Sequence, residues 1–210
     1  IKESRGFLAN IRKAVYYLCS CNLAELILIF LGVCIFKAPV LAAVQILLIN
    51  LLTDSAPAIS YSLEKAEQSV MKKKSFKKLR RVFDIRSIAV IMLQGLFMAL
   101  AALVSFAIGN TISYETAMTM AFVTLGLAQG IHCFNNKFEG TIFKKEVFSN
   151  SFMNKSVFAE MFAVVFLAFT PVGFIFGLTI ITLPQFLIAL ALALTILPIS
   201  ELLKFIKSKV

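Results

Sequence analysis

Six long runs of apolar residues divide the chain, and each is long enough to cross a bilayer as a helix. A spanning helix needs about 20 predominantly apolar residues. Very short turns join the first run to the second, the third to the fourth and the fifth to the sixth, which predicts three hairpins. The pattern therefore predicts an all-α membrane protein with six transmembrane helices, at roughly 14–36, 38–60, 88–109, 116–134, 157–178 and 183–203.

Composition supports a membrane protein and excludes an ordinary soluble enzyme. Sixty per cent of the 210 residues are hydrophobic and only 15% are charged, whereas soluble domains are about 45–50% apolar and about 25% charged. The net charge of +10 does not indicate nucleic-acid binding, because the apolar runs are too long for a soluble core of this size. In a membrane protein, basic charge indicates orientation instead.

All but one of the basic residues lie on one side of the predicted membrane. Of the 21 Lys and Arg residues, 20 fall in the amino-terminal stretch, the carboxy-terminal tail and the two longer loops, 61–87 and 135–156, and only Lys37 falls opposite. Cytoplasmic loops carry an excess of Lys and Arg. We therefore expect both termini and both long loops to be cytoplasmic.

The loop 61–87 carries nine of these basic residues, most of them in the segment 72–81. Two interpretations are open. The segment binds anionic lipid, with about 1 kcal/mol contributed by each basic residue near the surface, or it is a solvated loop that only enforces topology.

Polar side chains interrupt the first two apolar runs at helical spacing. Asn22 and Glu25 are three residues apart, so a helix presents both side chains on one face. Asn50, Thr53 and Asp54 follow the same rule in the second run. Ionisable side chains inside a membrane are energetically costly and indicate a functional site.

Pro57 predicts a break in the second helix next to these residues. Proline lacks a backbone N–H, and its ring clashes with the carbonyl four residues earlier, here that of Thr53. Unwound backbone is tolerated within a membrane where it is buried or lines a cavity, and its carbonyls can then bind ions. The two helices together offer carboxylates, amides, a hydroxyl and backbone carbonyls.

These ligands are all oxygens, which favours a hard cation. Ca²⁺ takes 6–8 oxygen ligands, Mg²⁺ needs a tighter octahedron, and soft transition metals prefer nitrogen or sulfur. Ca²⁺ fits best, while Na⁺, K⁺ and H⁺ remain open. A structural alternative also remains, in which the same side chains hydrogen-bond between helices.

Four further polar residues lie in the later runs. Gln129, in the fourth run, can complete the cation site with its amide oxygen. We interpret His132, one turn on, as a buried hydrogen-bonding partner. Glu160 and Glu201 lie near the predicted cytoplasmic ends of the fifth and sixth helices, where we expect them to reach headgroups or water.

Two sequence runs resemble the carboxy-terminal membrane half of P-type cation pumps, from the fifth to the tenth membrane helix. They are Asn22-Leu-Ala-Glu25 and Gln45-Ile-Leu-Leu-Ile-Asn-Leu-Leu-Thr-Asp-Ser-Ala-Pro57. The calcium pumps of the reticulum type and their bacterial counterparts are the most similar members. The resemblance extends over the whole chain, although Asp-Ser-Ala-Pro replaces the family's usual Asp-Gly-Leu-Pro.

The resemblance implies a set of cation ligands. In the calcium pumps the matching positions form two sites that share the residue corresponding to Asp54. Gln129 stands where the reticulum pumps carry a carboxylate, which removes one negative charge. The implied metal ligands in this chain are Asn22, Glu25, Asn50, Thr53, Asp54 and Gln129.

The resemblance also implies partners and a location. Residues 1–210 would be the cation-transport domain of a multi-pass pump, in the cell membrane of a bacterium or otherwise in an organelle membrane. The first four membrane helices and the actuator, phosphorylation and nucleotide domains, which use Mg²⁺ and ATP, would belong to the parent pump. No Asp-Lys-Thr-Gly-Thr phosphorylation motif occurs in these residues, so we do not expect the chain alone to hydrolyse ATP.

The expected function is therefore membrane translocation of a cation, with Ca²⁺ exported from the cytoplasm. Two alternatives stay open. One is a P-type pump for Na⁺, K⁺ or H⁺, and the other is a stand-alone secondary transporter or membrane subunit.

Overall fold

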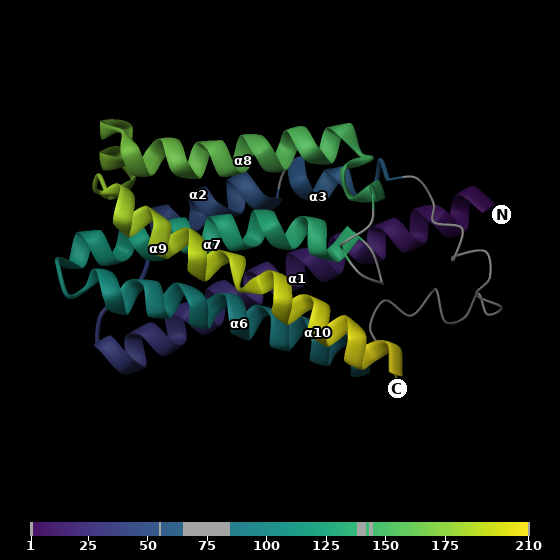
Figure 1. Ribbon diagram of the computed structural model, residues 1–210, viewed down its shortest axis with the longest axis horizontal. Helices are drawn as coiled ribbons and strands as arrows, with labels where there is room; N and C mark the ends of the chain where they lie inside the picture. Colours follow the sequence, from purple (N-terminus) through teal and green to yellow (C-terminus); the bar gives the residue numbers. More distant parts are fainter. Residues whose placement is uncertain (1, 55, 65–84, 138–141, 143–144, 210) are drawn as a thin grey trace.

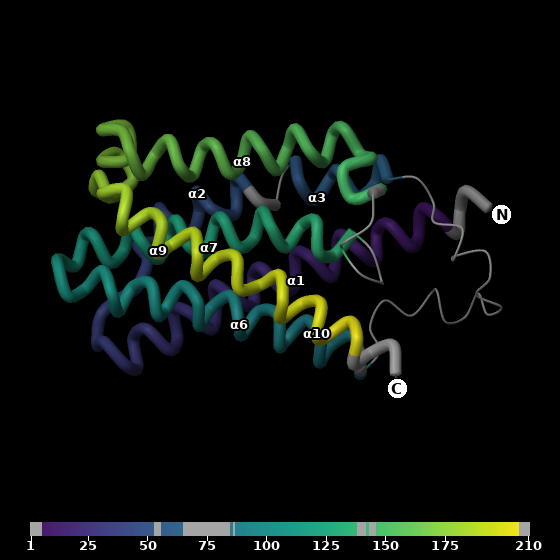
Figure 2. Tube along the Cα trace, viewed as in Figure 1, coloured from purple at the N-terminus to yellow at the C-terminus, as the bar shows by residue number. Residues whose placement is uncertain are grey.

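The computed structural model describes residues 2–54, 56–64, 85–137, 142 and 145–209, and the regular secondary structure in this part of the chain consists of helices (Figures 1 and 2). The basic segment 72–81 lies outside the described residues. The helices are α1 (Lys2–Phe36), α2 (Ala43–Asp54), α3 (Ala56–Ser60), α6 (Ile85–Gly109), α7 (Tyr114–Lys137), η1 (Lys145–Phe148), α8 (Ser151–Phe169), η2 (Pro171–Phe176), α9 (Leu183–Leu194) and α10 (Ile196–Lys209).

The prediction of six membrane-spanning helices is confirmed. Six helical segments of the described chain are long and apolar enough to cross a bilayer. The start of α1 and the end of α10 lie at the same end of the bundle (Figure 1), as an even number of crossings requires. The six spans are 6–36, 43–60, 87–109, 114–137, 151–169 and 183–205.

The end of α1 shows why the second span begins later than the predicted residue 38. Lys37 adopts a left-handed backbone conformation with φ of 56°, and its N–H bonds to the Val33 carbonyl at 3.1 Å, which closes the last turn. Helix α2 then begins at Ala43. The break predicted near Pro57 adjoins residue 55, which is outside the described residues; Pro57 itself lies in the first turn of α3, where a missing N–H is tolerated.

The fifth span begins and ends earlier than the predicted 157–178. Asn150 caps α8, because its side-chain oxygen accepts a hydrogen bond from the Met153 backbone N–H at 3.0 Å. The helix therefore starts at Ser151. Pro171 disfavours helical geometry in the residue before it, and Thr170 is accordingly extended.

A local irregularity at Thr195 divides the sixth span into α9 and α10. Pro198 has no N–H and its ring clashes with the carbonyl of residue 194 in a regular helix. The Thr195 N–H instead bonds to the Leu192 carbonyl at 3.2 Å, in the tighter 3₁₀ pattern. Proline thus shapes both carboxy-terminal spans.

Helix α7 forms the centre of the bundle. The most apolar stretch of this helix is 89% buried inside the protein, whereas the corresponding stretches of the other five spans are 22–39% buried. It packs against α6, α8 and α9, and α1 packs mainly on α6. Close packing therefore does not follow the three predicted hairpins throughout: α6 and α7 pack as a sequential pair, but α1 and α9 lie against helices other than their chain neighbours.

Large apolar side chains cover the outside of the bundle. On α8, Phe158, Phe162 and Phe166 are exposed at a spacing of four residues and form one stripe. Such a stripe would be unfavourable in water and is suited to lipid.

Two glycines of α6 allow close contact with neighbouring helices. A Cβ atom at Gly95 would lie 3.0 Å from the Ser20 carbonyl oxygen of α1. One at Gly109 would lie 2.6 Å from Cα and 2.9 Å from the backbone nitrogen of Ala117 on α7. Backbone atoms cannot turn away as a side chain can, so position 109 requires glycine, whereas a Cβ at position 95 would need a small shift of α1.

We expect Gly109→Ala to force α6 and α7 apart at their connection and to lower the free energy of unfolding by about 1–3 kcal/mol. The measurement is the midpoint of thermal unfolding of the full-length protein in detergent. Ala107→Leu, at an exposed position in the same turn, is the control and should leave the midpoint unchanged. Equal midpoints for Gly109→Ala and the unsubstituted protein would contradict the packing described.

Candidate cation site

Glu25 is a carboxylate held inside the membrane-spanning part of the bundle. It is 4% exposed and shares the inward face of α1 with Cys21, Ala24 and Leu28, all of which are buried. The spacing of three, four and seven residues keeps these side chains on one side of the helix. The apolar face that fixes the rotation of α1 therefore also carries the carboxylate inward.

Gln129 of α7 meets this carboxylate. Its Nε2 donates a hydrogen bond to Glu25 Oε1 at 3.1 Å, and its side chain is fully buried. The second polar atom of the amide, Oε1, is buried with no hydrogen-bond partner within the described residues. Since a buried polar atom without a partner is energetically costly, this oxygen is an available ligand.

The second helix of the predicted site brings a further oxygen. Asn50 is half-buried on α2, which packs against α7, and its Oδ1 is buried without a partner among the described side chains. The backbone of Thr53 and Asp54 completes the last turn of α2. Their side chains lie outside the described residues, so their role as ligands stays a prediction.

Asn22 is not brought together with Glu25 and Gln129. It lies on the exposed face of α1, the face that also carries Leu26 and Phe30, both of which are more than half exposed. The helical spacing correctly places Asn22 near Glu25 along the helix, but the boundary between the inward and outward faces runs between them.

The described residues contain no group of three or more His, Cys, Asp and Glu side chains that could hold a metal. The predicted ligand set does not depend on such a cluster, because four of its six side chains are amides or a hydroxyl. The described side chains thus supply one carboxylate and two amides of that set: Glu25, Gln129 and Asn50.

His132 is a buried partner, as predicted. Its Nε2 lies 2.9 Å from Ser20 Oγ, and its ring stacks on Tyr17 with centroids 6.0 Å apart. The ring is fully buried. It therefore joins α7 to α1 one turn away from the bond between Gln129 and Glu25.

The prediction that Glu160 reaches headgroups or water is wrong, since the side chain is 2% exposed. The error follows from the helix start. Had α8 begun at residue 157, Glu160 would lie in the first turn, but the helix begins at Ser151 and Glu160 lies in its third turn. Gly130 of α7 leaves room for it, because a Cβ there would be 3.4 Å from Glu160 Oε1. Glu201 is half-buried and accepts from the Ile142 N–H at 2.9 Å.

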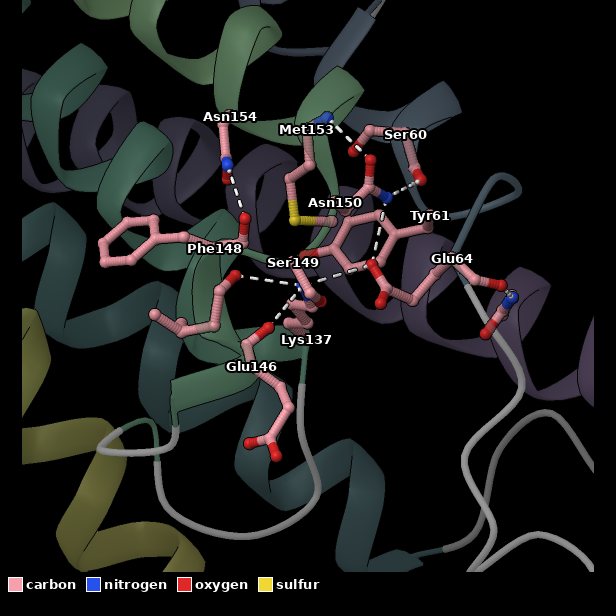
Figure 3. A network of polar contacts seen from close by, with 12 residues as sticks. Ser60, Tyr61, Glu64, Lys137, Glu146, Phe148, Ser149, Asn150, Met153 and Asn154 are labelled. Atoms are coloured by element: carbon pink, nitrogen blue, oxygen red, sulfur yellow. Dashed lines mark hydrogen bonds and ion pairs between the residues drawn. The ribbon is translucent and has the colours of Figure 1, made fainter.

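Two structural polar residues were not identified from the sequence. Gln45 is buried; its Oε1 accepts from the Ala42 N–H at 3.0 Å at the start of α2, and its Nε2 donates to the Gly177 carbonyl at 3.1 Å. Lys137, the last residue of α7, is also fully buried and forms an ion pair with Glu64 (Figure 3). The sequence pattern did not indicate that Lys137 is buried, because that pattern places the residue in the loop 135–156.

Comparison with known proteins identifies the family. The family model described as "Cation transporting ATPase, C-terminus" matches residues 38–206. This chain belongs to that family. It is an integral, multi-pass membrane region of a P-type cation pump.

The related proteins include bacterial calcium pumps. The chain is 29% identical to "Calcium-transporting ATPase 1" of Bacillus cereus over 99% of the chain and 26% of the relative. It is 30% identical to "Calcium-transporting ATPase" of Bacillus subtilis over 81% of the chain and 20% of that protein. With "Calcium-transporting ATPase 1" of Lactococcus lactis the identity is 37%, over 60% of the chain and 14% of the relative. The chain therefore spans about a quarter or less of the length of these relatives.

We expect Gln129→Met in the complete pump to lower the free energy of unfolding by about 1–3 kcal/mol, because the buried carboxylate of Glu25 loses a hydrogen-bond donor. Gln94→Met is a matched control: Gln94 is also buried, but its Nε2 donates to the neutral Ser200 hydroxyl at a longer 3.4 Å. Thermal unfolding in detergent should show the larger loss for Gln129→Met. A larger loss for Gln94→Met would contradict the importance of the bond to Glu25.

Proposed function

We propose that this chain binds Ca²⁺ and carries it across the membrane as part of an ATP-driven pump that exports Ca²⁺ from the cytoplasm. The observation that carries the proposal is the hydrogen bond between Gln129 and Glu25, two polar side chains buried at the centre of a membrane bundle. The names of the related proteins, which are calcium-transporting ATPases, support the choice of ion.

The ligands we propose lie on three helices, of which α1 and α2 each pack against α7. Glu25 comes from α1 and Gln129 from α7, while α2 contributes Asn50, Thr53 and Asp54. Carboxylate, amide and hydroxyl oxygens are the ligands that Ca²⁺ prefers. Asn22 lies on the exposed face of α1. It would become a ligand when the rest of the pump packs against that face.

Binding of the cation would require a rearrangement of Gln129. An amide nitrogen carries two hydrogens and cannot ligate a cation, and it is Nε2 that now points to Glu25. A half-turn of the amide would present Oε1, the buried atom without a partner, beside the carboxylate. The cation would then replace the hydrogen bond as the link between α1 and α7.

The charge of the site would favour one divalent ion between Glu25 and Asp54. Gln129 adds a dipole and no charge. Release on the far side would be assisted by protonation of the two carboxylates, because desolvation favours the neutral form of a carboxyl group. The start of α1 and the end of α10 would face the cytoplasm, as the distribution of Lys and Arg predicts.

The remaining parts of the pump would supply the chemical energy. We propose that the first four membrane helices and the actuator, phosphorylation and nucleotide domains are the partners of this chain, with Mg²⁺ and ATP bound there. The chain alone would bind the cation and pass its occupancy to those domains through α1 and through the segment that follows α3.

We expect Asp54→Asn or Glu25→Gln in the complete pump to abolish Ca²⁺-stimulated phosphoenzyme formation, because each removes a charged ligand and keeps the shape of the side chain. The measurement is phosphoenzyme formed from labelled ATP over a series of free Ca²⁺ concentrations. Glu115→Gln is the control, since Glu115 is an exposed carboxylate in the first turn of α7, several turns away from Gln129.

Undiminished stimulation by Ca²⁺ in Asp54→Asn would contradict the proposal. Stimulation of the unsubstituted pump by Na⁺ or K⁺, or by protons alone, with no response to Ca²⁺, would assign it to another cation.

A further inference from the structure

The amino-terminal part of the loop after α3 is wound tightly and held from several sides. Four successive hydrogen bonds of the 3₁₀ type continue from α3: Tyr61 to Ala58, Ser62 to Ile59, Leu63 to Ser60 and Glu64 to Tyr61. Glu64 lies next to the end of α7, since its Oε2 is 3.4 Å from Nζ of Lys137. At the same place the Asn10 side chain of α1 donates to the Glu64 backbone carbonyl at 2.6 Å.

Lys137 lies at the centre of the contacts in this region (Figure 3). Its Nζ donates to the carbonyls of Glu146 and Val147 at 3.0 and 2.9 Å and to Ser149 Oγ at 3.0 Å. It lies 3.4 Å from Glu64 Oε2. The side chain of Lys137 is fully buried, and that of Glu64 is 9% exposed.

Asn150 joins the same carboxylate to the start of α8. Its Nδ2 donates to Glu64 Oε2 at 3.0 Å and to the Ser60 carbonyl, at the end of α3, at 2.9 Å. Its Oδ1 caps α8 through the Met153 N–H. One side chain therefore fixes the end of α3 to the beginning of α8.

Tyr61, directly after α3, adds a bond to α7. Its hydroxyl donates to the Cys133 backbone carbonyl at 2.6 Å, one turn before Lys137. Burial raises the pKa of Tyr61 well above its ordinary value, so the hydroxyl stays protonated and able to donate.

The complete burial of Lys137 calls for a physical explanation. Burial of an ion pair is costly, and such pairs are better explained by the arrangement they specify than by net stability. Here Lys137 specifies how far along α7 the end of α3 attaches. Eight residues, or about 12 Å of helix, separate Lys137 from Gln129 on the same rigid α7.

We propose that Lys137, with Glu64, is a positioning residue that sets the height of α2 and α3 against α7 and thereby the affinity of the cation site. The inference rests on the proposed function, since the ligands it aligns are those of that site. Neither residue touches the cation: Lys137 holds Glu64, Glu64 ends the wound segment after α3, and α2 with Asn50 lies directly before α3 in the chain.

The test is a titration of phosphoenzyme formation with Ca²⁺ in the complete pump. We expect Lys137→Met to raise the half-saturating Ca²⁺ concentration about tenfold, while the maximal phosphoenzyme per folded pump is unchanged, because every ligand is still present. Lys155→Met is the matched control, a lysine exposed near the start of α8, and should leave both values unchanged.

Glu64→Gln gives a second, milder test that keeps the size of the side chain. It should shift the half-saturating concentration in the same direction, and the double variant Lys137→Met/Glu64→Gln should be no worse than Lys137→Met alone, since both changes break one interaction. If Lys137→Met does not fold, Glu64→Gln decides the question.

A half-saturating Ca²⁺ concentration within twofold of the control, with only the thermal stability reduced, would overturn the positioning role and leave Lys137 a structural residue. A loss of maximal phosphoenzyme without a change in apparent affinity would overturn it as well. Failure of the proposed function has a different signature, namely no Ca²⁺ response in the unsubstituted pump. In that case the same comparison is made with the cation that does stimulate it.

Discussion

Water is absent from the hydrocarbon core of a bilayer, so every polar side chain placed there must find its partner inside the protein. Helix α7 is where this constraint is met. It is surrounded by the other helices, and three of its polar side chains bond to α1, to the segment after α3 and to the segment before α8. Gln129, His132 and Lys137 mark three levels along one helix: the first two join it to α1, and the third joins it to the segments that follow α3 and precede α8.

This arrangement connects the site to the part of the chain that lies outside the membrane. Gln129 and Asn50 have buried oxygens without partners in the described chain, which is unfavourable for a purely structural clamp and supports the proposed cation site. At the outer level, the three hydrogen bonds and the ion pair of Lys137 leave little freedom. Lys137 is thus held by several partners, whereas the oxygens of Gln129 and Asn50 that we propose as ligands have none in the described chain.

The sequence was sufficient for those features that depend on local periodicity. The length of the apolar runs predicted six spans, and the spacing within α1 and the composition of the fourth run placed Glu25 and Gln129 in one candidate site. Features that depend on packing were beyond it. Tertiary structure determines the rotation of α1, which exposes Asn22, and the contact of α1 with α6. It also determines the start of α8 at the Asn150 cap, which leaves Glu160 in the interior. Lys137 was missed because a lysine at the end of an apolar run ordinarily faces water.

The central claim is that a cation takes the place of the hydrogen bond between Glu25 and Gln129. The most direct test is the structure of the complete pump, determined by electron cryo-microscopy in excess Ca²⁺. We expect ion density about 2.3–2.6 Å from a Glu25 carboxylate oxygen, with the Gln129 amide turned so that Oε1 faces the ion. Bound Ca²⁺ elsewhere in the membrane region, with Gln129 Nε2 still donating to Glu25, would contradict it.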